Sequence, residues 1–191
     1  MSQNIKIFQN ALPKELCDRL MAKFNDDADV RSDPQPDYST REFLFLSDKS
    51  SWSSALLKVS EFAHSVVGDY FTYPPPYEEF SRTEWFDDGY VLARYKPGDI
   101  CALHDDGQVA GGHVRLATLL FYLNSVSDGG ETYFPLQDIK VAPEQGAAVL
   151  FPPTLHYPHE VLPPKQDRYI LQTWIVDPYL LVVEGNAYST E

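Results

Sequence analysis

From Glu84 onward the sequence consists of short β-rich runs separated by glycine, proline and aspartate turns. Among the turn signals are Asp128-Gly129-Gly130 and Glu144-Gln145-Gly146. Several short strands at this spacing are typical of a β-sandwich or jelly roll. We therefore predict a mainly β core over residues 86–178. The runs cover residues 90–95, 115–123, 131–134, 147–151 and 168–176.

The first 85 residues have a different pattern, which predicts a scaffold of helices and strands outside that core, within a single domain of 191 residues. Residues 5–8 and 41–46 are expected to be strands, 25–40 a loop, 73–77 an extended connector and 179–191 a tail. Two helices are predicted, the second capped by Ser51 or Ser53. Their apolar positions are Leu12, Leu16, Leu20, Met21 and Phe24 in the first, and Leu56, Leu57, Val59, Phe62, Ala63, Val66 and Tyr70 in the second.

His104 and Asp106 form a His-x-Asp pair, and His159 follows His104 by 55 residues. Two imidazoles and one carboxylate occupy one face of an octahedral metal and leave the other positions open, which is the ligand set of non-haem Fe(II) oxygenases. A jelly roll brings such distant residues to one mouth. Two alternatives stay open. Asp105 could replace Asp106, although strand alternation favours Asp106, and His156 could replace His159.

Arg168 lies nine residues after His159 and is the candidate partner of a cosubstrate. Its guanidinium is permanently charged, and its fork of N–H donors could hold the far carboxylate of 2-oxoglutarate. A surface salt bridge is the competing role. The alternating pattern of Tyr169-Ile170-Leu171 aims Arg168 inward and favours the cosubstrate.

The C-terminal half carries further short motifs in a fixed order around these residues. Each of them is common alone, and their order and spacing make the set specific. They are Tyr95-Lys96-Pro97-Gly98 before His104 and Asp106; Thr118-x-x-x-Tyr122-Leu123-Asn124; Gly129-Gly130-Glu131-Thr132-x-Phe134-Pro135; Gly146 with Leu150-Phe151-Pro152; Pro158-His159-Glu160-Val161-x-Pro163; and Arg168-Tyr169 with Trp174.

This ordered set, from Tyr90 to Asp177, resembles the prolyl 4-hydroxylase-like 2-oxoglutarate/Fe(II) dioxygenases. Within them it looks closest to the hypoxia-sensing type and its bacterial and viral relatives. The resemblance implies a double-stranded β-helix (jelly-roll, cupin-like) core. It also implies Fe(II) as the cofactor, 2-oxoglutarate and O2 as cosubstrates, and ascorbate as an optional auxiliary.

By the same resemblance, His104, Asp106 and His159 ligate iron, and Arg168 pairs with the distal carboxylate of 2-oxoglutarate. Related halogenating enzymes lack the carboxylate ligand, so the presence of Asp106 favours hydroxylation. Four further positions bind the cosubstrate or line its pocket: Tyr95, Tyr122, Thr118 and Trp174. The N-terminal half shows no assignable match, so fold and chemistry transfer better than substrate does.

The expected reaction is hydroxylation of an unactivated C–H bond with release of succinate and CO2. A prolyl residue of a protein or peptide is the leading substrate, and a free amino acid or small metabolite is the alternative. A cupin-like protein that binds a metal or a small acid without oxidising anything is the rival class. Arg168 argues against that rival, because such a protein has no need of it.

Charge and composition exclude other classes. With 15 basic and 28 acidic residues the net charge is −13, and the basic residues are scattered along the chain. Direct binding of nucleic acid is therefore not expected. There is no signal peptide and no apolar run long enough to span a bilayer, so we expect a soluble, cytoplasmic protein. Cys17 and Cys101 do not suggest a disulfide framework.

Two further histidines and two arginines lie outside these motifs. His113 is expected in an exposed loop, and His64 is expected to be structural. Arg94 and Arg115 flank the metal-binding region and could contact the substrate, although charged residues are common at the rim of a site.

Overall fold

The computed structural model describes residues 4–33, 37–72, 76, 81, 84–107 and 113–181, with side chains up to residue 179. The predicted connector over residues 73–77, apart from Pro76, lies outside the described residues. The predicted tail over residues 179–191 overlaps the last strand, which extends to Leu181, and the tail from residue 182 lies outside the described residues. None of the helices in the described part is long and apolar enough to cross a membrane.

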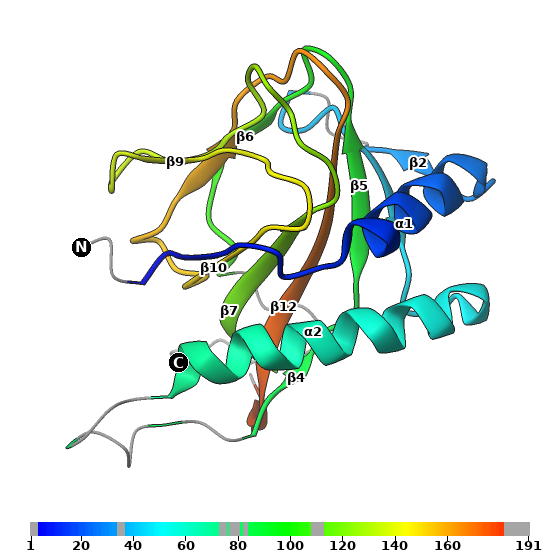
Figure 1. The fold of residues 1–191 in the computed structure, drawn as a ribbon. Helices are drawn as coiled ribbons and strands as arrows, with labels where there is room; N and C mark the ends of the chain where they lie inside the picture. The colour runs from blue at the N-terminus through cyan, green and yellow to red at the C-terminus, as the bar shows by residue number, and fades with distance from the viewer. Residues whose placement is uncertain are drawn as a thin grey trace, which may run out of the picture.

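Two antiparallel sheets form the core, as the jelly-roll prediction requires, and the prediction of a mainly β fold is confirmed (Figure 1). The larger sheet has the order β1-β10-β7-β12-β5-β3-β2 with β4 on β12, and the smaller has the order β6-β11-β8-β9. The strands are β1 Lys6–Phe8, β2 Arg31–Ser32, β3 Glu42–Phe45, β4 Phe86–Asp87, β5 Val91–Tyr95, β6 Cys101–His104, β7 His113–Tyr122, β8 Thr132–Phe134, β9 Ile139–Val141, β10 Ala148–Phe151, β11 His159–Val161 and β12 Arg168–Leu181.

Alternation along the central strands gives the larger sheet two buried faces. On β7, Leu119 and Phe121 pack toward the helices, whereas Leu120 and Tyr122 face the smaller sheet. Successive side chains of a strand point to opposite faces, so the near-continuous apolar runs of the sequence follow from burial on both sides. The face toward the smaller sheet is the one that carries the site.

Helices α1 (Lys14–Asp26) and α2 (Ser53–Phe71) cover the other face of the larger sheet (Figure 1). Most of the predicted apolar positions are buried or half-buried, but Leu57 is 69% exposed. The helices thus lie outside the jelly roll, as predicted. The buried helix residues that pack on this face include Leu16, Leu20, Phe24, Val59, Ala63 and Val67.

Two local predictions in the N-terminal half were wrong. Neither Ser51 nor Ser53 caps α2: a 3-10 turn, η1 (Ser50–Trp52), leads into the helix, and no side chain bonds its first amides. The predicted loop over residues 25–40 contains the short strand β2, which pairs with β3. The sequence of this segment has no alternation, so only the neighbouring strand stabilises its extended conformation.

The turn at Gly129 provides a test of the backbone geometry. Its φ is +72°, and an added Cβ would lie 2.1 Å from the carbonyl oxygen of Pro163. We expect Gly129→Ala to lower the free energy of unfolding by at least about 2 kcal/mol, from strain and overlap together. Chemical denaturation measures the change.

Gly68 in α2 is the matched control, since a Cβ added there meets nothing within 4 Å. Gly68→Ala is expected to raise the free energy of unfolding by about 0.5–1 kcal/mol, because alanine loses less backbone entropy in a helix. If Gly129→Ala and Gly68→Ala changed the free energy of unfolding in the same direction, this account of Gly129 would be contradicted.

Candidate metal centre and cosubstrate pocket

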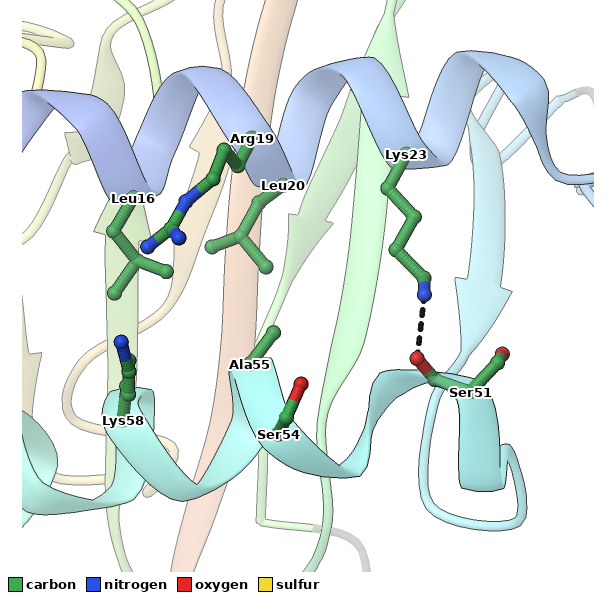
Figure 2. Close-up of a pocket in the computed structure, with 8 residues that line it drawn as sticks. All are labelled: Leu16, Arg19, Leu20, Lys23, Ser51, Ser54, Ala55 and Lys58. Carbon is green, nitrogen blue, oxygen red and sulfur yellow. Dashed lines mark hydrogen bonds between the residues drawn. The ribbon is translucent and has the colours of Figure 1, made fainter.

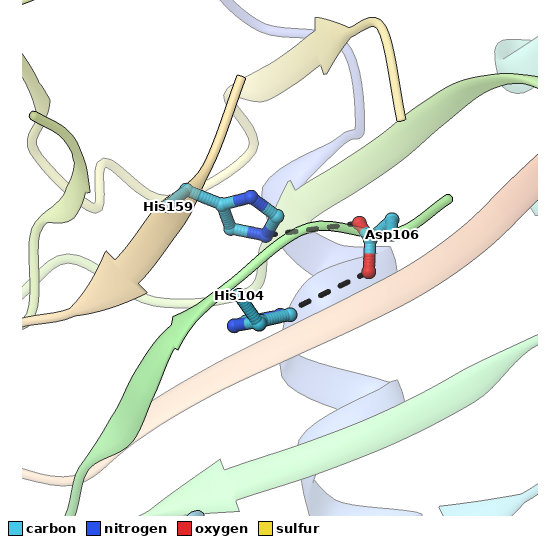
Figure 3. Close-up of side chains that lie close together, drawn as sticks. All are labelled: His104, Asp106 and His159. Atoms are coloured by element: carbon cyan, nitrogen blue, oxygen red, sulfur yellow. Dashed lines mark ion pairs between the residues drawn. The ribbon is translucent and has the colours of Figure 1, made fainter. Parts of the chain in front are cut away.

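His104, Asp106 and His159 meet because β6 and β11 are neighbours in the smaller sheet, where His104 and His159 are paired across the two strands. The Nε2 atom of His104 lies 3.8 Å from one carboxylate oxygen of Asp106, and the Nε2 atom of His159 lies 3.7 Å from the other (Figure 3). All three ligand atoms lie within 4.8 Å of one another. One metal ion could bind all three.

Neighbouring groups hold the three side chains in this orientation. The Nδ1 atom of His104 lies 2.7 Å from the Ala102 carbonyl oxygen, and that of His159 lies 3.3 Å from the Tyr157 carbonyl oxygen. A protonated Nδ1 in each ring leaves the Nε2 lone pair free for a metal. The hydroxyl of Thr118 donates to Asp106 at 2.7 Å. Thr118, expected to line the pocket, therefore orients the carboxylate.

Protonation of the two rings differs because their surroundings differ. Burial lowers the pKa of His159 to about 4, so the ring is neutral near pH 7. Burial also favours the neutral form of His104, but the Cys101 thiol and the Asp106 carboxylate outweigh it and raise the pKa of that ring. Neutral imidazole is the form that binds a metal, so a metal at this centre would displace any proton on His104.

Neither alternative ligand belongs to the metal-binding group, although Asp105 lines the pocket beside it. Asp105 is exposed and accepts a hydrogen bond from the Gly107 amide, and His156 is exposed as well. His113, expected in a loop, instead begins β7 and packs edge-on against Phe86 with ring centroids 5.0 Å apart. His64 lies on α2, where it stacks on Trp85. Among the described residues, only His104, Asp106 and His159 form a group able to hold a metal.

Arg168 is completely buried between the two sheets. Its guanidinium lies 5.0 Å from the Tyr95 ring and 5.4 Å from the Tyr122 ring, and its Nη2 donates to Thr132 at 3.0 Å. Nε and Nη1 have no hydrogen-bond partner, and no carboxylate of the described residues pairs with this cation. A buried cation with two unused donors is costly unless an anion joins it, so Arg168 is suited to pair with a carboxylate ligand.

The two tyrosines suit the same ligand. Burial raises the pKa of both Tyr95 and Tyr122, so each phenol keeps its proton and can donate a hydrogen bond. In the structure the Tyr122 hydroxyl contacts Thr132 at 2.7 Å. Tyr95 and Tyr122 thus flank the buried Arg168 guanidinium and surround it with polar groups shielded from solvent.

An open pocket of about 220 Å³ leads to the metal-binding group. Trp174, predicted to line it, does so together with Gln172. Sequence reasoning missed Gln172, although the alternation of Arg168, Ile170, Gln172 and Trp174 along β12 would have placed it on the same face.

The N-terminal half also reaches the pocket, which the sequence did not indicate. The Tyr38 carbonyl accepts a hydrogen bond from the Ala102 amide at 2.8 Å, and this pairing fixes the segment along β6. Tyr38 then packs against His104 with ring centroids 5.6 Å apart. Arg41 lines the same pocket and donates to the Tyr95 hydroxyl at 3.5 Å.

Arg94 and Arg115, which flank the metal-binding region in the sequence, lie on opposite faces of the larger sheet. Arg115 lies at the pocket, donates to the Asp106 carbonyl at 2.8 Å and covers the Trp174 ring at 3.8 Å. Arg94 points to the helix side of the larger sheet, where it pairs with Glu42 and bonds to Tyr169. A substrate contact remains open to Arg115 only, because β5 presents Arg94 to the wrong face.

The fold and the site agree with the comparisons to known proteins. Residues 90–176 match the profile of the 2OG-Fe(II) oxygenase superfamily. A viral collagen prolyl hydroxylase from Paramecium bursaria Chlorella virus-1, solved with 2OG, is 21% identical with a TM-score of 0.67, over 91% of this chain and 96% of that chain. No curated protein sequence matches the chain significantly.

Two other solved structures have the same fold. A prolyl-4-hydroxylase from Pseudomonas putida is 18% identical with a TM-score of 0.63, over 92% of this chain and 94% of that one. A Trichoplax adhaerens prolyl hydroxylase, solved with a peptide fragment of the hypoxia inducible factor oxygen degradation domain, is 18% identical with a TM-score of 0.71, over 92% and 84%.

Residues 90–176 are therefore a 2OG-Fe(II) oxygenase domain. This match and the group formed by His104, Asp106 and His159 support a 2-oxoglutarate/Fe(II) dioxygenase with Fe(II) as cofactor and 2-oxoglutarate as cosubstrate. The fold of the whole chain is that of the prolyl hydroxylase structures.

Proposed function

We propose that this dioxygenase hydroxylates a prolyl residue of a protein or peptide, with Fe(II) bound by His104, Asp106 and His159. The distal carboxylate of 2-oxoglutarate pairs with Arg168 in this proposal. The observation that carries it is the fully buried Arg168 guanidinium, whose Nε and Nη1 have no partner. A protein that only bound a metal would gain nothing from this buried, unpaired cation.

In this proposal the side chains of the site hold the metal and the cosubstrate and orient them. His104 and His159 offer Nε2 lone pairs, because each Nδ1 faces a backbone carbonyl. Thr118 fixes one oxygen of Asp106. Arg168 and the two tyrosine hydroxyls offer donors to a carboxylate in a space shielded from water. Bound Fe(II) and 2-oxoglutarate supply the oxidising power that converts a C–H bond to C–OH with O2, releasing succinate and CO2.

The prolyl assignment rests on the solved structures with this fold, of which the viral, bacterial and Trichoplax examples are all prolyl hydroxylases. The pocket is consistent with it, because a volume of about 220 Å³ admits one ring-sized group. Trp174 and Tyr38 offer aromatic faces there, and Arg115 lies beside Trp174.

A free amino acid or other small acid is the second candidate. Arg41 and Arg115 both line the pocket, and a free carboxylate is the natural partner of a guanidinium. Both candidates use the same chemistry and differ only in what enters the mouth of the pocket.

Succinate formation tests the proposal. The enzyme is incubated with Fe(II), ascorbate, O2 and 2-oxoglutarate, with and without a pool of proline-containing peptides. We expect succinate to rise with peptide and to vanish in Asp106→Ala. Stimulation by amino acids but not by peptides would establish the second candidate instead.

An anaerobic spectrum separates the oxygenase from a non-oxidising metal-binding protein. Under argon, the protein with Fe(II) and 2-oxoglutarate should show a weak visible charge-transfer band that disappears on admission of air. A bound iron without this band, together with no succinate, would overturn the proposed function.

A further inference from the structure

A second polar site lies on the opposite side of the larger sheet from the metal centre, between α1 and α2 (Figure 2). We call it the interhelical groove. It has a volume of about 260 Å³ and an apolar floor formed by Leu16, Leu20 and Ala55. Lys23 closes one end by donating to the Ser51 carbonyl at 2.5 Å, and its ammonium lies 5.0 Å from the Trp52 ring.

Three cations line this groove, and none of its lining residues is acidic: Arg19 and Lys23 come from α1, and Lys58 from α2. Figure 2 shows Arg19 and Lys58 at the same end, away from Lys23. The basic residues are scattered in the sequence, but the packing of the two helices gathers these three. Basic residues that are scattered along the chain therefore do cluster on this one surface.

Arg19 and Lys58 are exposed, and neither has an ion pair or hydrogen bond to any residue that the structure describes. Several other cations of this acidic protein pair with carboxylates. Glu15 precedes Arg19 by one helical turn, yet these two do not pair. With three cations and no carboxylate among its lining residues, the groove is a local cationic surface on a chain of net charge −13. The cations that do pair with carboxylates include Lys14, Arg41, Lys49, Arg94 and Lys96.

We propose that the interhelical groove binds an acidic segment of a protein partner. An apolar side chain of that segment rests on Leu16, Leu20 and Ala55, and carboxylates on either side of it meet Arg19 and Lys58. Charge complementarity selects this occupant, because three cations and no carboxylate line the groove on a chain of net charge −13. A nucleic acid fits poorly: its backbone needs an extended cationic track, and the net charge of −13 repels it beyond these few residues.

This inference does not depend on the proposed function, because the groove and the metal centre lie on opposite faces of the larger sheet. The groove would hold a partner, or a distant part of a protein substrate, without obstructing the pocket. Failure of one proposal leaves the other standing.

Fluorescence polarisation with the full-length, iron-loaded protein tests the proposal. The probe is a labelled 12-residue peptide of alternating Glu and Leu, compared with the same peptide carrying Gln in place of Glu. We expect the Glu peptide to bind and the Gln peptide to bind at least tenfold more weakly. Affinity for the Glu peptide should fall as salt is added.

Charge reversal locates the binding surface. Arg19→Glu combined with Lys58→Glu should weaken the Glu peptide about tenfold or more, since two ion pairs become two repulsions. The matched control is Lys140→Glu with Lys165→Glu, which changes the net charge equally at exposed positions outside the groove. The control should bind within about twofold of the parent.

Three results would overturn the proposal: no binding of the Glu peptide, equal binding of the Gln peptide, or equal weakening in both double variants. A single-stranded oligonucleotide that binds the parent and loses affinity in the Arg19/Lys58 variant would also overturn it, in favour of a nucleic-acid site. Circular dichroism checks that both variants are folded. Ala55→Phe, which fills the floor without changing charge, should weaken the Glu peptide as well.

Discussion

His159→Ala is expected to abolish iron binding and succinate formation while leaving the protein folded. The ring is buried, its pKa is lowered to about 4 by that burial, and its Nε2 lies 3.7 Å from Asp106. Loss of groups that merely orient a ligand costs about 10- to 100-fold in metal affinity or activity, so loss of a ligand itself should exceed that range. Iron content after anaerobic loading and succinate formation measure the two effects.

His156→Ala is the matched control, since it removes the same side chain three residues earlier. His156 is exposed, and only its backbone carbonyl is used, as an acceptor for Gln137. Removal of the His156 side chain should change iron content and succinate formation by less than about twofold. A large loss of both in His156→Ala, beside a small loss in His159→Ala, would assign the ligand role to His156. Asp106→Ala and Asp105→Ala form a second pair with the same expected contrast.

Arg168→Ala is expected to weaken 2-oxoglutarate by roughly 10- to 150-fold and to leave iron affinity nearly unchanged. It removes one charge-assisted pair, which is worth about 1.5–3 kcal/mol. In the parent, two donors of this buried cation have no protein partner and are available to the carboxylate. Once Arg168 is gone, the uncharged hydroxyls of Tyr95 and Tyr122 can replace only part of this interaction. Titration of 2-oxoglutarate under argon, followed by the visible band, gives the affinity.

Stability distinguishes this role from a structural one. Without 2-oxoglutarate, the buried Arg168 lacks a counterion among the described residues, so Arg168→Met should be as stable as the parent or more stable. Added 2-oxoglutarate should raise the unfolding temperature of the parent and not that of the variant. Arg168→Lys keeps the charge but loses the fork of N–H donors. Its affinity for 2-oxoglutarate should lie between those of the parent and of Arg168→Met. A strongly destabilised Arg168→Met protein with normal 2-oxoglutarate affinity would contradict the assignment.

The fold could be predicted to the level of its class and its longer elements. The runs that became β5, β7, β10 and β12 are mainly apolar, and their burial on both faces makes them visible in the sequence. The strands β9 and β11 are not predicted, whereas β1 and β8, of the same three-residue length, lie within predicted runs. The extended conformation of β9 and β11 is stabilised by pairing with neighbouring strands. The strand β2 and the start of α2 were likewise not predicted correctly.

The sequence also predicted only part of the candidate site, because some of its residues reach the site through long-range pairing. His104, Asp106, His159 and Arg168 are marked by residue type and spacing, which the chemistry of a metal and a carboxylate ligand requires. Tyr38 and Arg41 carry no such mark. They reach the pocket because the segment around Tyr38 pairs with β6, a contact between residues that are more than 60 positions apart.

The sequence by itself determined the donor set, the β-rich core and the order of the motifs, since these depend on residue chemistry and on local periodicity. Only the tertiary structure decided on which face of a sheet or helix pair each side chain lies. Strand register turned Arg94 away from the site and Arg115 toward it, and helix packing gathered Arg19, Lys23 and Lys58 at one groove. The physical reason is that a side chain's partners across a sheet or between helices are set by long-range pairing, which no local pattern encodes.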